Sequence, residues 1–241
     1  RGAVRQRLPL LRVVLDELRR VSAHEPLDAR IAELAEAASI PALLEMVLER
    51  YEATFDGRGA DLVRRAMSFI WASRQGLEEG ELRDLLGSDD DPLPAAVWSP
   101  LRIAAADMFI ERGGLIDFAH DFFRQAVEDR YLGGLEAKHE VHRRLADYMA
   151  TRAITPRALE ELPAQLAALE AWPELAELLA DPHWLSPLWE RDKSEVMWRW
   201  ARIHERSDIS ASALFDAMSD EQLDQAGTRF LIDAARLLEN F

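Results

Sequence analysis

His120 is the side chain in this sequence that is best placed to do chemistry. It lies in the segment FAHDFFRQAVEDRY, residues 118–131, after a short apolar run and before an aromatic-rich amphipathic stretch that predicts a helix. A histidine at this position most simply caps the helix or bonds a backbone carbonyl. Asp121, however, can itself satisfy the N–H groups at the helix start. The imidazole would then point away from the helix and could donate a hydrogen bond to an anion.

Two other groups of residues could in principle bind a metal ion. His139 and His142 are one helical turn apart, but HEVH is not the HExxH spacing of a zinc helix, so we expect a structural surface pair. The acidic segment SDDDP, residues 88–92, lacks the alternating ligands of a calcium loop, which predicts a solvated loop. The sequence therefore predicts no metal site.

Nucleophilic and phosphate-binding chemistry is also limited. The chain has no cysteine, which excludes a thiol nucleophile and a thiolate metal site. Only Lys138 and Lys193 are lysines, and neither follows a glycine, so these residues contain no GxxxxGK[ST] phosphate loop. We expect no catalytic residue and no enzyme activity in this chain, and no bound cofactor in these residues alone.

Composition limits the remaining classes of function. No apolar run reaches the ~20 residues that cross a bilayer, and the first residues do not resemble a secretory signal. We therefore expect a soluble protein with no membrane partner, located in the cytoplasm, and a chain that begins inside a longer protein. The net charge of −15 disfavours nucleic acid as a partner. The 241 residues suffice for two subdomains.

The hydrophobic periodicity predicts a mainly α fold. Residues 1–58 read as a helical subdomain with helices over 8–23, 27–38 and 40–55. Residues 59–133 predict a winged helix-turn-helix domain, because three short helices precede two β-prone runs, 108–111 and 115–118, on either side of Arg112-Gly113-Gly114, a β-hairpin signal.

The glycine pair at 133 and 134 predicts a boundary, after which only helical patterns follow. Residues 134–241 therefore predict a C-terminal helical array, either TPR-like or an irregular solenoid, with short breaks between its helices. The predicted helices span residues 136–152, 156–171, 173–181, 183–192, 193–207, 211–219 and 221–241.

Two segments resemble known motifs of the STAND-class signalling ATPases. FAHDFFRQAVEDRYL is similar to their methionine-histidine-aspartate signature on a winged helix, with Ala119 in the first position. RLPLLRVVLDELR is similar to the segment that opens their small helical domain, although Arg7 stands where a glycine or asparagine is usual. The resemblance implies that His120 reaches the β-phosphate of bound ADP and that Pro9 packs on the adenine. Pro9 can equally be a proline in a first helical turn, which needs no ligand.

Between these motifs, residues 8–190 resemble the NACHT-type members related to telomerase-associated and nephrocystin proteins. The resemblance implies that this chain is the regulatory arm of a signalling NTPase. The full-length protein would bind ADP or ATP with magnesium through an upstream nucleotide-binding domain of the same chain. It would form a homo-oligomer on activation, and its C-terminal helices would hold protein partners.

Two other classes of function remain open. A helical-repeat scaffold would bind proteins without any nucleotide, and a winged-helix regulator would bind DNA. In the predicted third helix only Arg102 is basic, while Glu111 and Arg112 nearly cancel on the wing, which favours protein packing over the major groove. Five tryptophans could anchor stacked helices or form an exposed partner groove: Trp172, Trp184, Trp189, Trp198 and Trp200.

Overall fold

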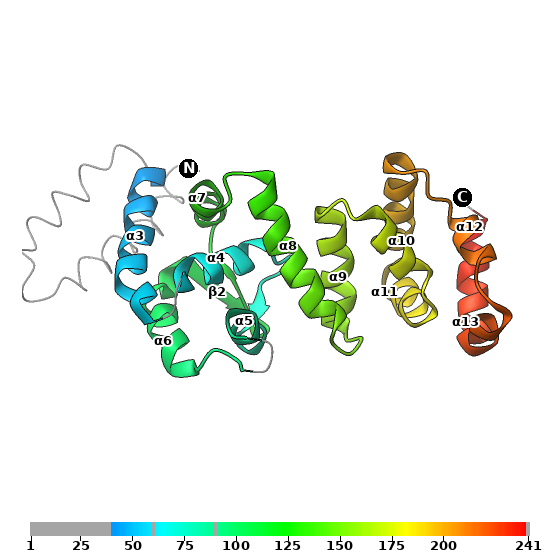
Figure 1. Cartoon of the computed structure of the whole chain (residues 1–241), viewed down its shortest axis with the longest axis horizontal. Helices are drawn as coiled ribbons and strands as arrows, with labels where there is room; N and C mark the ends of the chain where they lie inside the picture. The colour runs from blue at the N-terminus through cyan, green and yellow to red at the C-terminus, as the bar shows by residue number, and fades with distance from the viewer. Residues whose placement is uncertain (1–39, 59–60, 89–90, 240–241) are drawn as a thin grey trace, which may run out of the picture. The chain divides into compact units, whose positions relative to one another are not determined.

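The computed structural model describes residues 40–58, 61–88 and 91–239, which are mainly helical with one small sheet (Figure 1). The chain forms two compact units, residues 1–141 and 142–241, called here the first and the second unit. The predicted helices over 8–23 and 27–38 lie outside the described residues. None of the described helices has a stretch long and apolar enough to cross a membrane.

The described part of the first unit begins with α3, Ile40–Phe55, at the residues predicted for it, followed by the 3-10 turn η1, Asp56–Arg58. Apolar residues at three- and four-residue spacing bury one face of α3. This face packs on the later helices α4, α6 and α7. The buried residues of this face are Leu43, Leu44, Val47, Leu48 and Tyr51.

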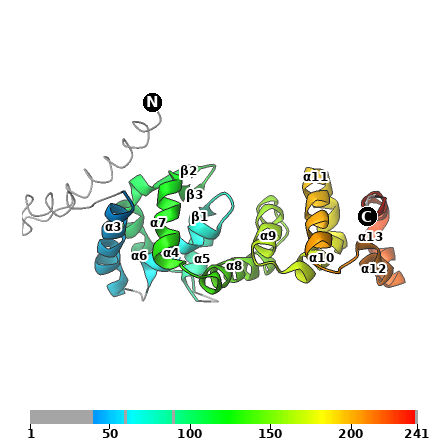
Figure 2. The same cartoon turned by 90° about the horizontal axis from the view of Figure 1, so that it is seen from above.

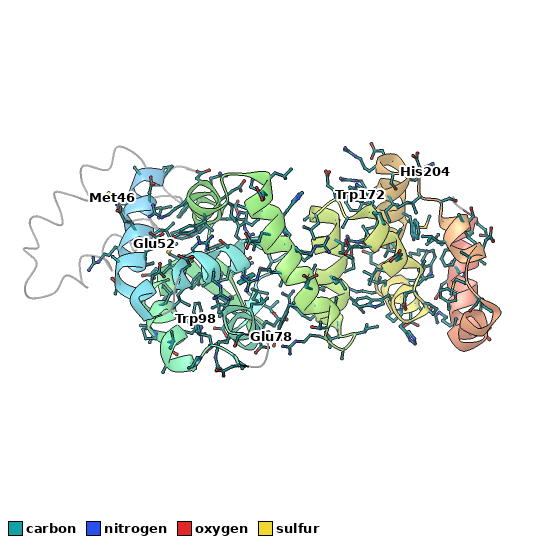
Figure 3. The ribbon with its side chains drawn as sticks, viewed as in Figure 1. Met46, Glu52, Glu78, Trp98, Trp172 and His204 are labelled. Atoms are coloured by element: carbon teal, nitrogen blue, oxygen red, sulfur yellow. The ribbon has the colours of Figure 1, made fainter. Side chains whose placement is uncertain are left out.

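A winged helix-turn-helix follows, as the sequence predicted. It consists of α4 (Leu62–Ala72), β1 (Leu77–Glu78), α5 (Glu79–Leu86), α6 (Ala95–Ala104), η2 (Ala106–Met108), β2 (Phe109–Arg112) and β3 (Leu115–Phe118). The strands form an antiparallel sheet in the order β1-β3-β2. Trp98 of α6 is fully buried in this unit (Figure 3).

Glycines set the geometry of this sheet. Gly113 and Gly114 turn the chain between β2 and β3 with φ values of 59° and 85°, which suits a tight hairpin. Gly76 has φ 94°, and a Cβ there would collide with the carbonyl oxygen of Ile116. Its missing side chain allows the following strand, β1, to pair with β3. The sequence did not predict β1, because two residues are too short for a periodic pattern.

Helix α7, Asp121–Tyr131, leaves the wing and completes the described core of the first unit. Its buried residues, Phe123, Ala126 and Val127, face α3 and α4. Lys138, at the far end of the unit, binds the carboxylate of Glu128, and its ammonium lies 5.7 Å from the centre of the Trp71 ring.

Helices form the whole described part of the second unit. Helix α10 packs against both α9 and α11, and α11 packs against α13 (Figure 2). Connections are short, and prolines stand near the N-termini of α9, α10 and α11, where they are tolerated. The helices are α8 (Leu135–Ala150), α9 (Pro156–Ala168), α10 (Trp172–Ala180), α11 (Pro182–Arg206), α12 (Ala211–Asp216) and α13 (Asp220–Leu238).

Two of these helices are interrupted. Asp192 breaks α11 with φ −156° and ψ 91°, and its Oδ1 accepts hydrogen bonds from the backbone N–H groups of Ser194 and Glu195 at 2.9 and 3.1 Å. This confirms the predicted break between residues 192 and 193. Gly227 interrupts α13 with φ 76°, whereas the sequence analysis predicted one continuous helix over 221–241.

The packing joins two parts that the sequence analysis had separated. Helix α3, from the predicted helical subdomain 1–58, packs directly on α4 and α7 of the predicted winged-helix domain 59–133. Both therefore lie in the first unit. The division from the second unit falls between Val141 and His142, inside α8.

Candidate functional site

His120 occupies the N-cap position of α7, in extended backbone conformation with φ −151° and ψ 149°. Its carbonyl oxygen accepts a hydrogen bond from the backbone N–H of Phe123 at 3.0 Å, while its side chain makes no capping bond. The imidazole is exposed and stacks on the ring of Phe122, with centroids 5.1 Å apart and planes at 17°. The ring is thus held at the surface beside the first turn of α7.

The imidazole of His120 forms no hydrogen bond or ion pair with any residue that the structure describes. Within the described residues, the ring nitrogens of His120 thus neither cap α7 nor bond a backbone carbonyl. A ring donor beside a helix N-terminus is suited to meet an anion. Pro9, the other residue assigned to nucleotide contact, lies outside the described residues, so the adenine contact stays a prediction.

The face of the winged helix that would enter DNA carries little net positive charge. Arg102 of α6 forms ion pairs with Glu79 of α5 and with Glu111 of β2, the latter at 2.6 Å. The only basic residue of this helix is thus neutralised by two carboxylates. Beside it, Ile103 is 70% exposed and lines a cavity of about 370 Å³ between α6 and the sheet. This surface favours contact with an apolar partner over contact with phosphates.

The other histidines and acids singled out in the sequence are placed only in part by the structure. The Nδ1 atom of His142 lies 2.6 Å from Oε1 of Gln165, so this half-buried imidazole has a structural partner within the second unit. Two of the acids in segment 88–92 lie outside the described residues. Among the residues with described positions, no three histidine, cysteine or acidic side chains are grouped so that they could hold a metal ion.

Most of the C-terminal tryptophans anchor helices, as expected. Trp172 (Figure 3), Trp184 and Trp200 are buried, whereas Trp198 is 54% exposed on α11. The guanidinium of Arg202 lies 5.2 Å from the centre of the Trp198 ring. Trp198 is therefore the most exposed tryptophan of this group, whereas Trp189 is partly exposed.

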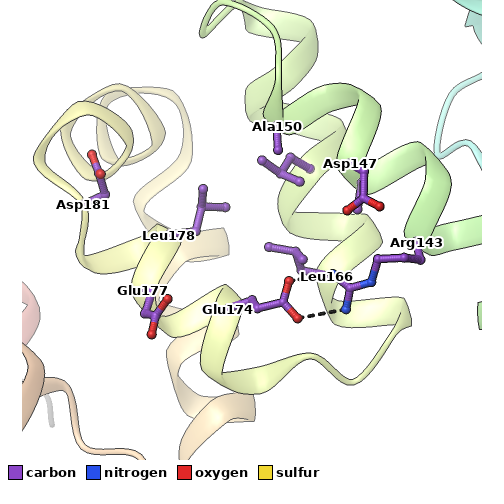
Figure 4. A pocket seen from close by; sticks show the side chains of 10 residues that line it. Arg143, Asp147, Ala150, Leu166, Glu174, Glu177, Leu178 and Asp181 are labelled. Carbon is purple, nitrogen blue, oxygen red and sulfur yellow. Dashed lines mark hydrogen bonds and ion pairs between the residues drawn. The ribbon is translucent and has the colours of Figure 1, made fainter. Parts of the chain in front are cut away.

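The second unit contains an open groove of about 320 Å³ formed by α8, α9 and α10 (Figure 4). Its apolar lining comes from all three helices. Leu162 and Leu166 of α9 are buried beneath it, and Leu178 of α10 is partly exposed. Ala146 and Ala150 complete this apolar part along α8. Because the alanine side chains are small, the groove stays open on the side of α8.

The charged part of the groove is mostly acidic. Arg143 of α8 binds the carboxylate of Glu174 through two hydrogen bonds, at 2.5 and 2.8 Å, across the groove (Figure 4). This ion pair lowers the pKa of Glu174 and raises that of Arg143, mainly through the side-chain hydrogen bonds. Asp147, Glu177 and Asp181 add three further carboxylates.

The sequence analysis did not identify this groove. A signal was present, since Glu174, Glu177 and Asp181 recur at three- and four-residue spacing within ELAELLAD, residues 174–181. Their position opposite Asp147 depends on how α8 packs near α10, which no local pattern gives.

Comparisons with known proteins agree with a helical array. A TPR repeat-containing protein of Dictyostelium discoideum is 31% identical over 173 residues, which are 71% of this chain and 10% of that protein. The chain thus spans about a tenth of the length of this relative. No family model matches the sequence. No solved structure matches it either.

Proposed function

We propose that this chain is a protein-interaction scaffold, in which the helical array of the second unit holds a partner protein. The observation that carries this proposal is the array itself: α9, α10, α11 and α13 pack in succession and leave an open, charged groove beside α8. Stacked helices that contact only their neighbours present one extended surface to a partner. The similarity to a TPR repeat-containing protein supports the same function.

The winged helix of the first unit fits this proposal better than it fits a DNA-binding role. Its third helix, α6, presents the exposed Ile103 and an arginine that two carboxylates neutralise. Such a surface lacks the excess of basic groups that duplex binding requires. We therefore assign the winged helix to contacts with protein, within its own chain or beyond it.

The test is to isolate a protein that co-purifies with the full-length protein and then measure its affinity for the 241-residue chain. Trp198→Ala removes the exposed aromatic ring of the array, and His120→Ala changes the first unit only. We expect direct binding that array substitutions outside the groove, such as Trp198→Ala, weaken and that His120→Ala leaves unchanged. Binding that survives every array substitution would refute the scaffold proposal.

A second function is favoured by the exposed imidazole of His120 at the N-terminus of α7. We propose that this ring contacts the β-phosphate of ADP bound by another domain of the full-length protein, as in the STAND-class resemblance. Loss of ADP would release the contact and let the helices rearrange, so the contact would stabilise one state over another. The upstream nucleotide-binding domain and an oligomer on activation are parts of this proposal.

The nucleotide contact is tested in the full-length protein with His120→Ala, with Arg112→Ala at the wing tip as a matched control. One hydrogen bond to a charged group is worth about 1.5–3 kcal/mol, so we expect His120→Ala to weaken ADP binding by about tenfold or more. The control should bind ADP like the wild type. Equal affinity in all three proteins would exclude the contact.

A further inference from the structure

The groove of the second unit has an excess of negative charge, because its lining contains more acidic than basic side chains. Four carboxylates line it, those of Asp147, Glu174, Glu177 and Asp181, against the single guanidinium of Arg143. Arg143 is already engaged by Glu174. Asp181 also has an internal role, since its Oδ1 accepts a hydrogen bond from the backbone N–H of His183 at 2.7 Å. The exposed carboxylates of Asp147 and Glu177 are therefore the most available to an incoming cation.

Apolar surface lies between these charges. Leu166 and Leu178 lie between carboxylates, with Asp147 of α8 on one side and Glu177 of α10 on the other (Figure 4). Leu162 also lines the groove. The volume of about 320 Å³ is at the lower end of the ~300–1,000 Å³ typical of small-molecule sites, which suits a few side chains. A metal ion would gain nothing from contact with the leucine side chains. In addition, the described residues contain no group of three histidine, cysteine or acidic side chains that could hold a metal ion.

We propose that this groove binds a basic segment of a partner protein, with an apolar side chain against the leucines and lysine or arginine side chains beside Asp147 and Glu177. The inference rests on the proposed scaffold function and adds the chemistry of the partner. Charge complementarity carries it, because an acidic rim around an apolar floor attracts a cationic segment and disfavours an acidic one. The net charge of −15 on the chain favours the encounter with the same kind of partner.

The probe is a short fluorescein-labelled peptide of alternating lysine and leucine, titrated into the 241-residue chain by fluorescence anisotropy. Two peptides of the same length serve as controls, one with glutamate in place of lysine and one with serine in place of leucine. We expect saturable binding of the lysine-leucine peptide, weaker binding of the lysine-serine peptide and none of the glutamate-leucine peptide. Binding should weaken as the salt concentration rises.

Substitutions locate the binding surface. The double variant Asp147→Lys/Glu177→Lys should weaken binding by about tenfold or more, because it replaces two attractions by two repulsions. Its matched control, Glu205→Lys/Asp216→Lys, makes the same change of charge at exposed positions of the second unit that do not line the groove. Ala150→Trp adds a large ring at an exposed position of the groove and should also reduce binding. Circular dichroism checks that each variant is folded.

Three results would overturn the inference: no saturable binding of the lysine-leucine peptide, equal loss in both double-charge variants, or equal binding of the glutamate-leucine peptide. Equal loss would mean that the net charge of the chain attracts the peptide without a defined site. None of these results removes the scaffold function, which is decided by the capture of the protein partner and by array variants outside the groove. A scaffold that loses its partner with Trp198→Ala and keeps it with Asp147→Lys/Glu177→Lys would show that the array binds through another surface.

Discussion

Glu52 of α3 and Arg130 of α7 form a two-point ion pair that joins distant parts of the first unit. Nε and Nη2 of Arg130 lie 2.8 and 2.7 Å from the two carboxylate oxygens of Glu52, and the Tyr131 hydroxyl donates to Oε1 at 2.5 Å. Both ionic side chains are mostly buried, with 20% and 26% of their surface exposed. The pair connects the helix that precedes the winged helix to the helix that leaves it.

The pair makes the stability of the first unit depend on pH. Hydrogen bonds from Arg130 lower the pKa of Glu52 below its usual value, and the Tyr131 hydroxyl contributes in the same direction. A carboxyl group with a lowered pKa stabilises the folded state at pH values above the pKa of the unfolded state, about 4.3. This contribution disappears as the pH falls through the pKa of the folded state.

Glu52→Gln should therefore lower the free energy of unfolding by about 1–3 kcal/mol at pH 7. Urea unfolding at a series of pH values should show the difference from wild type shrinking in acid. Glu49→Gln, on the exposed side of α3, is the control, and a pH-independent difference would contradict the prediction.

The second unit contains a buried carboxylate whose removal should be costly. Glu161 is fully buried, accepting hydrogen bonds from Arg157 and from Nε2 of Gln165, each at 2.6 Å. Glu161→Ala leaves a largely buried guanidinium without this partner, and we expect a loss of about 3 kcal/mol in thermal or chemical unfolding. Glu161→Gln keeps an oxygen acceptor and should cost clearly less. Similar losses in both variants would mean that side-chain volume, and not the hydrogen bonds, matters here.

Two neighbouring glycines should respond in opposite directions to the same substitution. Gly76→Ala places a Cβ against the carbonyl oxygen of Ile116 at a φ of 94°, so we expect a loss of about 1–3 kcal/mol and weakened pairing of β1. Gly80 lies in α5, where a Cβ would meet no atom within 4 Å beyond the backbone of its own helix and its chain neighbours. Gly80→Ala should stabilise the protein by up to about 1 kcal/mol. Thermal unfolding of the two variants against wild type checks both signs.

The winged helix should not bind duplex DNA. Since Glu79 and Glu111 neutralise Arg102, a fluorescence titration with a labelled duplex at two ionic strengths should show no salt-sensitive binding. The variant Glu79→Gln/Glu111→Gln releases Arg102 and serves as the comparison. Tight binding by the wild type that weakens with salt would restore the DNA-binding alternative.

Local patterns were enough to predict most elements of the fold. The spacing of Leu44, Val47, Leu48 and Tyr51 predicted α3, and the glycine pair at 113 and 114 predicted the hairpin. These features depend on periodicity and turn chemistry, which act over a few residues.

The missed features depend on tertiary packing or on a single residue. Strand β1 exists because Gly76 lets the backbone approach Ile116, and the break in α13 rests on Gly227 alone. The groove brings Asp147 and Glu177 to the same leucines, although the two acids are remote in sequence. For His120 the sequence predicted a ring directed away from its helix toward an anion, whereas the structure shows an exposed imidazole stacked on Phe122 of the same helix. Its contact with a phosphate remains a prediction.

The scarcity of lysine has a practical consequence for mapping how this chain meets other proteins. Of the two lysines, Lys138 is held by Glu128 against Trp71, whereas Lys193 is exposed immediately after the break at Asp192. Within the described residues, amine-reactive cross-linkers would consequently report almost entirely on one position of α11. Carboxylate-directed reagents would sample the surface far more evenly, because acidic side chains outnumber lysines many times.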